Sequence, residues 1–231
     1  MKVIGLLGGM SWESTQSYYQ AINEGIKQQL GGLHSAELVL YSVDFEPIER
    51  LQHQGDWAAM AKILCSAAQG IERAGAEGLI ICTNTMHKLA DEVAASVSIP
   101  LLHIADATAE RLVKENVSRV GLLGTDFTMS QDFYKGRLQD KYGLDVLIPN
   151  NSDRQVVHKV IYEELCLGQI KESSKHAYLR IIDDLQSQGA QAVILGCTEI
   201  GLLVNQTDTA VPLLDTTAIH AERAIEFMLA N

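Results

Sequence analysis

Two patterns of apolar and polar positions recur along this chain. Short apolar runs that end in glycine, such as residues 3–7 before Gly8-Gly9, predict buried strands, and stretches with apolar residues three and four apart, such as 14–30, predict helices. Further strands are predicted at 38–43, 79–81, 101–104, 120–123, 146–149, 193–195 and 211–214, and a further helix at 130–142. Strands that alternate with helices favour parallel sheets with crossover helices.

The pattern of strands and turns occurs twice. GAEGLIICTNT at 75–85 aligns without gaps with GAQAVILGCTE at 189–199, 114 residues later. VIGLLGG and RVGLLGT are 116 residues apart, and PLL and AER each return after 112 residues. Glycine-ended strands are common in α/β proteins, so one such block would be weak evidence, but three blocks in the same order indicate a duplication.

The duplication predicts an α/β protein of two pseudo-symmetric doubly wound domains, each with a mainly parallel sheet flanked by helices. We expect residues 1–98 with 209–231 to form the first domain and residues 99–208 the second. Ligands of open α/β sheets bind outside the carboxyl ends of the strands. The active site is therefore expected in the cleft between the domains, with residues from just after strands of both halves.

The duplicated turn carries a thiol in one copy and a hydroxyl in the other. The ungapped alignment places Thr83 opposite Cys197 and Cys82 opposite Gly196. Neighbours on an extended segment point to opposite faces, so only one of Cys82 and Thr83 can face a ligand. The alignment favours Thr83, although a bend at the strand end would reverse that choice.

Cys197 is the strongest candidate for acid/base chemistry. A thiol has an ordinary pKa of about 8.5, and a helix N-terminus can lower it, which favours some thiolate near neutral pH. The short polar residues after both strands, with the amides of the following helices, could hold a carboxylate; helix capping alone is the alternative. Cys65 and Cys166 are interpreted as packing residues, and His87 as a residue that could orient a carboxylate.

Composition excludes several classes of function. The chain has 231 residues and a formal net charge of −11, which argues against nonspecific binding to nucleic acid or an anionic membrane. No apolar run approaches the roughly 20 residues of a membrane span, so a cytoplasmic location is expected. The four cysteines lack the spacing of a zinc site, and the glycine turns match no nucleotide-binding motif.

The motifs closely resemble those of the aspartate/glutamate racemase family. They are IGLLGGMSWEST at 4–15, CTNTMH at 82–87, GLLGT at 121–125, EELCLGQ at 163–169 and GCTEIGLL at 196–203. The resemblance runs essentially end to end. It implies two pseudo-symmetric α/β domains, usually in a homodimer, and racemisation of aspartate or glutamate without pyridoxal phosphate or metal.

In such enzymes two cysteines flank the α-carbon, and one removes the proton that the other replaces on the opposite face. Cys197 matches the second cysteine, whereas Thr83 stands in the place of the first. The family's second cysteine acts on the L-enantiomer. We therefore expect Cys197 to deprotonate L-substrates, and Thr83 or a water that it holds to return the proton, so that L-substrates are preferred.

The resemblance also implies substrate-binding residues and leaves several alternatives. The expected carboxylate contacts are Asn84, Thr85, Thr198 and Glu199, with Met10, Gln52 and Thr125 as additional contacts. Either Arg50 or Gln52 could face the site. The alternatives are a broad-specificity amino-acid racemase, an isomerase or decarboxylase on the same scaffold, and an amino-acid-binding protein without catalysis.

Overall fold

The computed structural model describes residues 1–230, and the chain divides into two compact units. The first contains Met1–Ile104 and the segment from His220 onward, and the second is Ala105–Ile219. The expected boundaries at 98/99 and 208/209 fall six and eleven residues earlier, respectively. Residues up to Ile104 stay with the first unit because Leu102 donates its N–H to the carbonyl of Leu79, and residues 209–219 join the second because they include a strand of its sheet.

The first unit is built on a parallel sheet with the strand order β2-β1-β3. Its strands are β1 (Ile4–Gly8), β2 (Leu38–Ser42) and β3 (Gly78–Ile81). Leu101 adds a single parallel bridge beside Leu79. The strand predicted at 101–104 is thus reduced to one bridge, because helix α5 (Ile104–Lys114) begins there.

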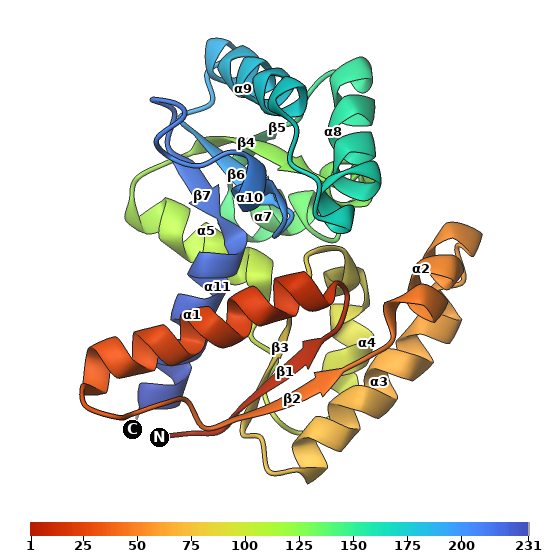
Figure 1. The fold of residues 1–231 in the computed structure, drawn as a ribbon, viewed down its shortest axis with the longest axis vertical. Coiled ribbons are helices and arrows are strands. Elements are labelled where there is room, and N and C mark those ends of the chain that lie inside the picture. The colour runs from red at the N-terminus through yellow and green to blue at the C-terminus, as the bar shows by residue number, and fades with distance from the viewer. Residues whose placement is uncertain (231) are drawn as a thin grey trace. The chain divides into compact units, whose positions relative to one another are not determined.

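Helices cover both faces of this sheet (Figure 1). They are α1 (Trp12–Leu30), α2 (Phe45–Gln54), α3 (Trp57–Arg73), the 3-10 helix η1 (Thr85–Leu89), α4 (Ala90–Ala95) and α11 (Thr216–Leu229). Ile4 and Leu6 of β1 pack with residues of α1 and α11, whereas Leu7 packs with residues of α3 and α4. This alternation is the one that a buried strand requires.

The second unit has a parallel sheet with the order β5-β4-β6-β7. Its strands are β4 (Arg119–Gly124), β5 (Asp145–Leu147), β6 (Ala192–Gly196) and β7 (Leu213–Asp215). The other helices are α6 (Asp126–Ser130), α7 (Lys135–Tyr142), α8 (Asn151–Glu163), the 3-10 helix η2 (Leu165–Leu167), α9 (Glu172–Ser187) and α10 (Ile200–Leu203). The helix predicted at 130–142 is found as α7, which starts five residues later at Lys135, because Gln131 is extended and ends the separate short helix α6.

The two sheets repeat the same register, which confirms the duplicated α/β fold. Two matching rows of paired residues cross the sheets, Gly5–Leu79–Leu101 in the first and Gly121–Val193–Leu213 in the second. Gly75 and Gly189, equivalent in the alignment, both have left-handed φ angles, of 99° and 97°. The turn before each central strand is therefore the same turn, and glycine is the residue that adopts it without steric cost.

Within residues 1–230, every helix is too short or too polar to cross a lipid bilayer.

Candidate functional site

The first turn, Cys82-Thr83-Asn84, follows the carboxyl end of β3. The Cys82 side chain is fully buried in the apolar cluster that joins the sheet to α1 and α11. This burial raises the pKa of the Cys82 thiol far above its usual range, so the group stays protonated and inert. Thr83 is half-buried. Of the two adjacent residues, Thr83 is the more exposed.

The second turn, Cys197-Thr198-Glu199, follows the carboxyl end of β6 and forms a compact hydrogen-bonded group. The half-buried Cys197 thiol donates to Oε2 of Glu199 over 2.9 Å, and the Thr198 hydroxyl donates to the same oxygen over 2.7 Å. The thiol of Cys166, in η2, lies 4.0 Å from Oε1. The buried Glu199 carboxylate therefore draws together two thiols and a hydroxyl.

The electrostatic setting of Cys197 differs from the sequence expectation. Burial is the largest cause that raises the pKa of the Cys197 thiol well above its usual range, followed by the negative charge of Glu199. The expected lowering by a helix N-terminus is not found. Helix α10 has four residues, too few for a strong dipole, and a carboxylate lies next to the sulfur. The resting form is a thiol that donates to a carboxylate.

The geometry leads to a prediction about pH. If Cys197 acts as a thiolate base, kcat/KM for an L-substrate should rise with pH and level off only above the ordinary thiol pKa of about 8.5. Glu199→Gln removes the negative charge that helps to raise the pKa of the Cys197 thiol. The rising limb should therefore move to lower pH, which a pH profile of kcat/KM for both proteins measures.

Two controls complete the pH experiment. Glu163→Gln removes an exposed carboxylate from α8 of the same unit and should leave the limb in place. Glu199→Asp keeps the negative charge with a shorter side chain and should keep the limb nearer to the wild-type position than Glu199→Gln does. A limb that stays fixed, or moves to higher pH, in Glu199→Gln would contradict the assigned influence of Glu199 on Cys197.

The other predicted substrate contacts lie in different surroundings. Asn84 and Thr85 are buried at the start of η1, directly after Thr83. Thr125 caps α6, because its hydroxyl accepts from the N–H of Thr128. Met10 and Gln52 are buried in the first unit, whereas Arg50 on α2 is exposed.

Sequence reasoning missed two side chains at the start of α1, one that holds the first turn and one that holds the glycine turn after β1. Ser14 donates from its hydroxyl to the carbonyl of Cys82 over 2.8 Å. Thr15 accepts from the N–H of Gly9 and donates to the carbonyl of Ser11. The signal that could have found them is the GGMSWEST motif itself, in which a glycine turn precedes hydroxyl residues at the start of a helix.

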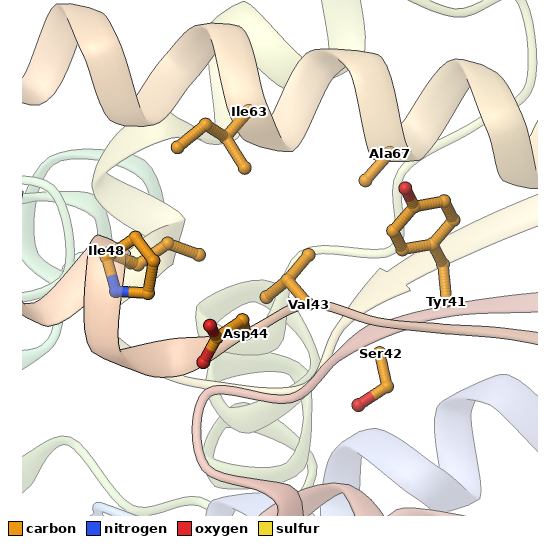
Figure 2. Close-up of a pocket in the computed structure, with 8 residues that line it drawn as sticks. Tyr41, Ser42, Val43, Asp44, Ile48, Ile63 and Ala67 are labelled. Carbon is orange, nitrogen blue, oxygen red and sulfur yellow. The ribbon is translucent and has the colours of Figure 1, made fainter.

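A separate hollow of about 290 Å³ opens in the first unit (Figure 2). Residues 41–44, at the end of β2 and just beyond, form one side, and Ile48 of α2 with Ile63 and Ala67 of α3 forms the other. None of the predicted site residues lines it. Within residues 1–230, no group of three His, Cys, Asp or Glu side chains could hold a metal ion.

Comparison with known proteins identifies the class of enzyme to which this fold and its two turns belong. The chain matches an aspartate racemase homologue, PH1733 from Pyrococcus horikoshii, with 38% identity, complete coverage of both chains and a TM-score of 0.86. It matches a candidate Asp/Glu racemase from Yersinia pestis with 55% identity, complete coverage of both chains and a TM-score of 0.94. The duplicated fold is thus that of two-domain racemases.

The family model for Asp/Glu/hydantoin racemases matches residues 7–224, and the chain belongs to that family. It is accordingly an amino-acid racemase. The broad specificity amino-acid racemase RacX of Bacillus subtilis is 21% identical over 240 residues, with 99% of both chains covered. These relatives span the whole chain, so the family assignment includes both turns.

Proposed function

We propose that this protein racemises acidic amino acids, aspartate or glutamate, and prefers their L-enantiomers. The observation that carries the proposal is the half-buried Cys197 thiol hydrogen-bonded to Glu199, with a threonine at the equivalent position of the first unit. The aspartate racemase homologue and the candidate Asp/Glu racemase, the relatives with 38% and 55% identity, support acidic substrates. The similarity to RacX supports the competing proposal of a broader substrate range.

In the proposed reaction, the Cys197 thiol first loses its proton to solvent, and the thiolate then removes the α-proton of an L-amino acid, while Thr83 or a water bound to it returns a proton to the opposite face. The Glu199 carboxylate accepts a hydrogen bond from the thiol in the resting state. When Cys197 has taken the α-proton, the same bond can form again. Proton transfer by positioned side chains needs neither pyridoxal phosphate nor a metal, and we propose that neither takes part.

The preference for the L-enantiomer follows from the different acidities of the Cys197 thiol and the Thr83 hydroxyl. A thiol has an accessible thiolate form, whereas the hydroxyl of threonine is a donor and acceptor that is very poorly acidic. Thr83 can therefore deliver or relay a proton but is a weak base for removing one. The α-proton of a D-enantiomer should therefore exchange with solvent much more slowly than that of an L-enantiomer, whereas net inversion has the same kcat/KM in both directions because the two enantiomers are equally stable.

The deciding experiment follows the α-proton of each enantiomer of aspartate and glutamate in D2O by proton NMR. We expect rapid exchange from the L-enantiomers, with slower appearance of the D-product, and much slower exchange from the D-enantiomers. Equal exchange from both hands would refute the preference. A panel of neutral amino acids and non-amino diacids distinguishes the alternatives: turnover of neutral amino acids supports broad specificity, and binding without any exchange supports an amino-acid-binding protein.

A further inference from the structure

The two peptide groups on either side of Thr83 are both held by side chains from elsewhere in the first unit. The preceding carbonyl, that of Cys82, accepts from the Ser14 hydroxyl at the start of α1 over 2.8 Å. The following carbonyl, that of Thr83 itself, lies 2.8 Å from Nδ1 of His87 in η1. A carbonyl oxygen can only accept, so Nδ1 of His87 carries the proton. Both backbone torsions of Thr83 are thereby fixed.

The second ring nitrogen of His87 fixes the ring in turn. Nε2 accepts from the N–H of Ile104 over 3.2 Å, so the ring is neutral and uses one nitrogen as donor and the other as acceptor. The side chain is buried and packs against the rings of His103 and His220, with centroids 4.6 and 5.7 Å away. A ring bound at both nitrogens and enclosed by two others has one orientation available.

The segment to which His87 is anchored is also fixed. The carbonyl of Leu102 accepts from Nε2 of His220 over 2.7 Å, and Nδ1 of His220 bonds to the hydroxyl of Tyr18. Burial lowers the pKa of His220 to about 4, so this ring is neutral too. His87 therefore links the turn of Thr83 to the segment 102–104, which His220 holds in place through the carbonyl of Leu102.

The equivalent turn of the second unit is stabilised in a different way. The carbonyl of Cys197, equivalent to that of Thr83, accepts from the backbone N–H of Ile200 over 3.1 Å, within its own following turn. The residue equivalent to His87, 114 positions later, is Gly201, which has no side chain. The contact of His87 is thus particular to the first turn, where a hydroxyl stands in place of a thiol.

We propose that Ser14 and His87 are positioning residues that fix the direction of the Thr83 side chain, so that the proton is returned to one face of the substrate. The inference rests on the proposed function, because it assumes that Thr83 delivers this proton. Neither residue needs to touch the substrate. Misplacing a reacting group by about 1 Å can cost on the order of 10²-fold in rate, so weakening these contacts should slow the return of the proton.

A matched pair of histidine variants tests the role of His87. The amide nitrogen of asparagine lies near the place of Nδ1, so His87→Asn keeps a donor for the carbonyl of Thr83. The amide of glutamine lies near the place of Nε2, so His87→Gln keeps only an acceptor for the N–H of Ile104. The measurement, in D2O with L-aspartate and L-glutamate, is the ratio of D-product formed to deuterium gained by the remaining L-substrate.

This ratio reports the proton return from the Thr83 side, because deuterium enters the L-substrate through Cys197 alone. We expect His87→Gln to lower the ratio by about 10-fold to 10²-fold, and His87→Asn to stay within about threefold of the wild type, since one hydrogen bond of typical strength is retained. Exposed His176, changed to glutamine, should leave the ratio unaltered. A His87→Gln variant with an unchanged ratio, or with equal losses of exchange and inversion, would overturn the inference.

Ser14→Ala provides an independent test through the other peptide group, in case His87→Gln does not fold. It should lower the same ratio, whereas Ser17→Ala, which removes an exposed hydroxyl from the same helix, should not. An unchanged ratio in folded Ser14→Ala overturns the inference for Ser14. Absence of exchange in the wild-type protein would refute the proposed function itself, while normal racemisation in all these variants would refute only the positioning roles.

Discussion

Replacing Cys197 with alanine is expected to abolish α-proton exchange from L-aspartate and L-glutamate. The thiolate is the only group assigned to remove that proton, and general acid–base catalysis by one positioned group contributes about 10²- to 10⁴-fold. The loss in kcat should lie in that range and should be seen as missing deuterium in both the remaining substrate and the product. Proton NMR in D2O measures both quantities in one experiment.

Two further cysteine variants make the result specific. Cys197→Ser places a hydroxyl in the second turn, as Thr83 does in the first, and should lose L-exchange almost as completely as Cys197→Ala. Cys65→Ala removes a half-buried thiol from α3, where its sulfur donates to the carbonyl of Glu92, and should leave the rate unchanged. Retained exchange in folded Cys197→Ala would remove the basis of the proposed mechanism.

Replacing Thr83 with cysteine is expected to give the opposite effect, a gain. A thiol at this position supplies a thiolate that can remove the α-proton from a D-substrate, which the hydroxyl does poorly. Exchange from D-aspartate and D-glutamate should increase on the order of 10²-fold. Activity toward the L-enantiomers should remain, because Cys197 and Glu199 are untouched.

The neighbouring residues provide the controls for this gain. Thr83→Ser keeps a hydroxyl and should show no gain with D-substrates. Cys82→Ala should also leave D-exchange unchanged, because the Cys82 thiol is buried among apolar side chains and its raised pKa keeps it protonated. If Thr83→Cys gave no gain while a substitution of Cys82 altered the exchange of D-substrates, the alignment of Thr83 with Cys197 would be wrong.

Much of the fold was predictable because the duplication can be recognised from short sequence segments. Each glycine-ended apolar run and each turn after it repeats, so one alignment gives the strands, their register and the pairing of Thr83 with Cys197. The exceptions are places where long-range contacts decide. Residues 101–104 have the composition of a strand, yet α5 begins at Ile104, and the helix that periodicity starts at residue 130 begins only at Lys135.

The chemistry around Cys197 was less predictable than its position directly after a strand. Cys197 stands before a helix in the sequence, which suggested a lowered thiol pKa, but the length of α10 and the direction of the Glu199 side chain are properties of the folded chain. The contact between Ser14 and the carbonyl of Cys82 joins residues 68 positions apart. No local pattern encodes such a contact, because side-chain to backbone bonds across elements depend on packing.

The two turns are held by different hydrogen bonds, and this difference determines whether each turn can be transferred to another protein. The second turn is stabilised by its own residues. The N–H of Ile200 donates to the carbonyl of Cys197, and the carboxylate of Glu199 accepts from the Cys197 thiol. A designer could graft that short segment after a parallel strand and carry its hydrogen bonds along. The first turn is instead held by residues outside it. Ser14 binds the carbonyl of Cys82, and His87 links the turn to the N–H of Ile104. A graft of the first turn alone would lack these two contacts, so its backbone would not be held in the same conformation.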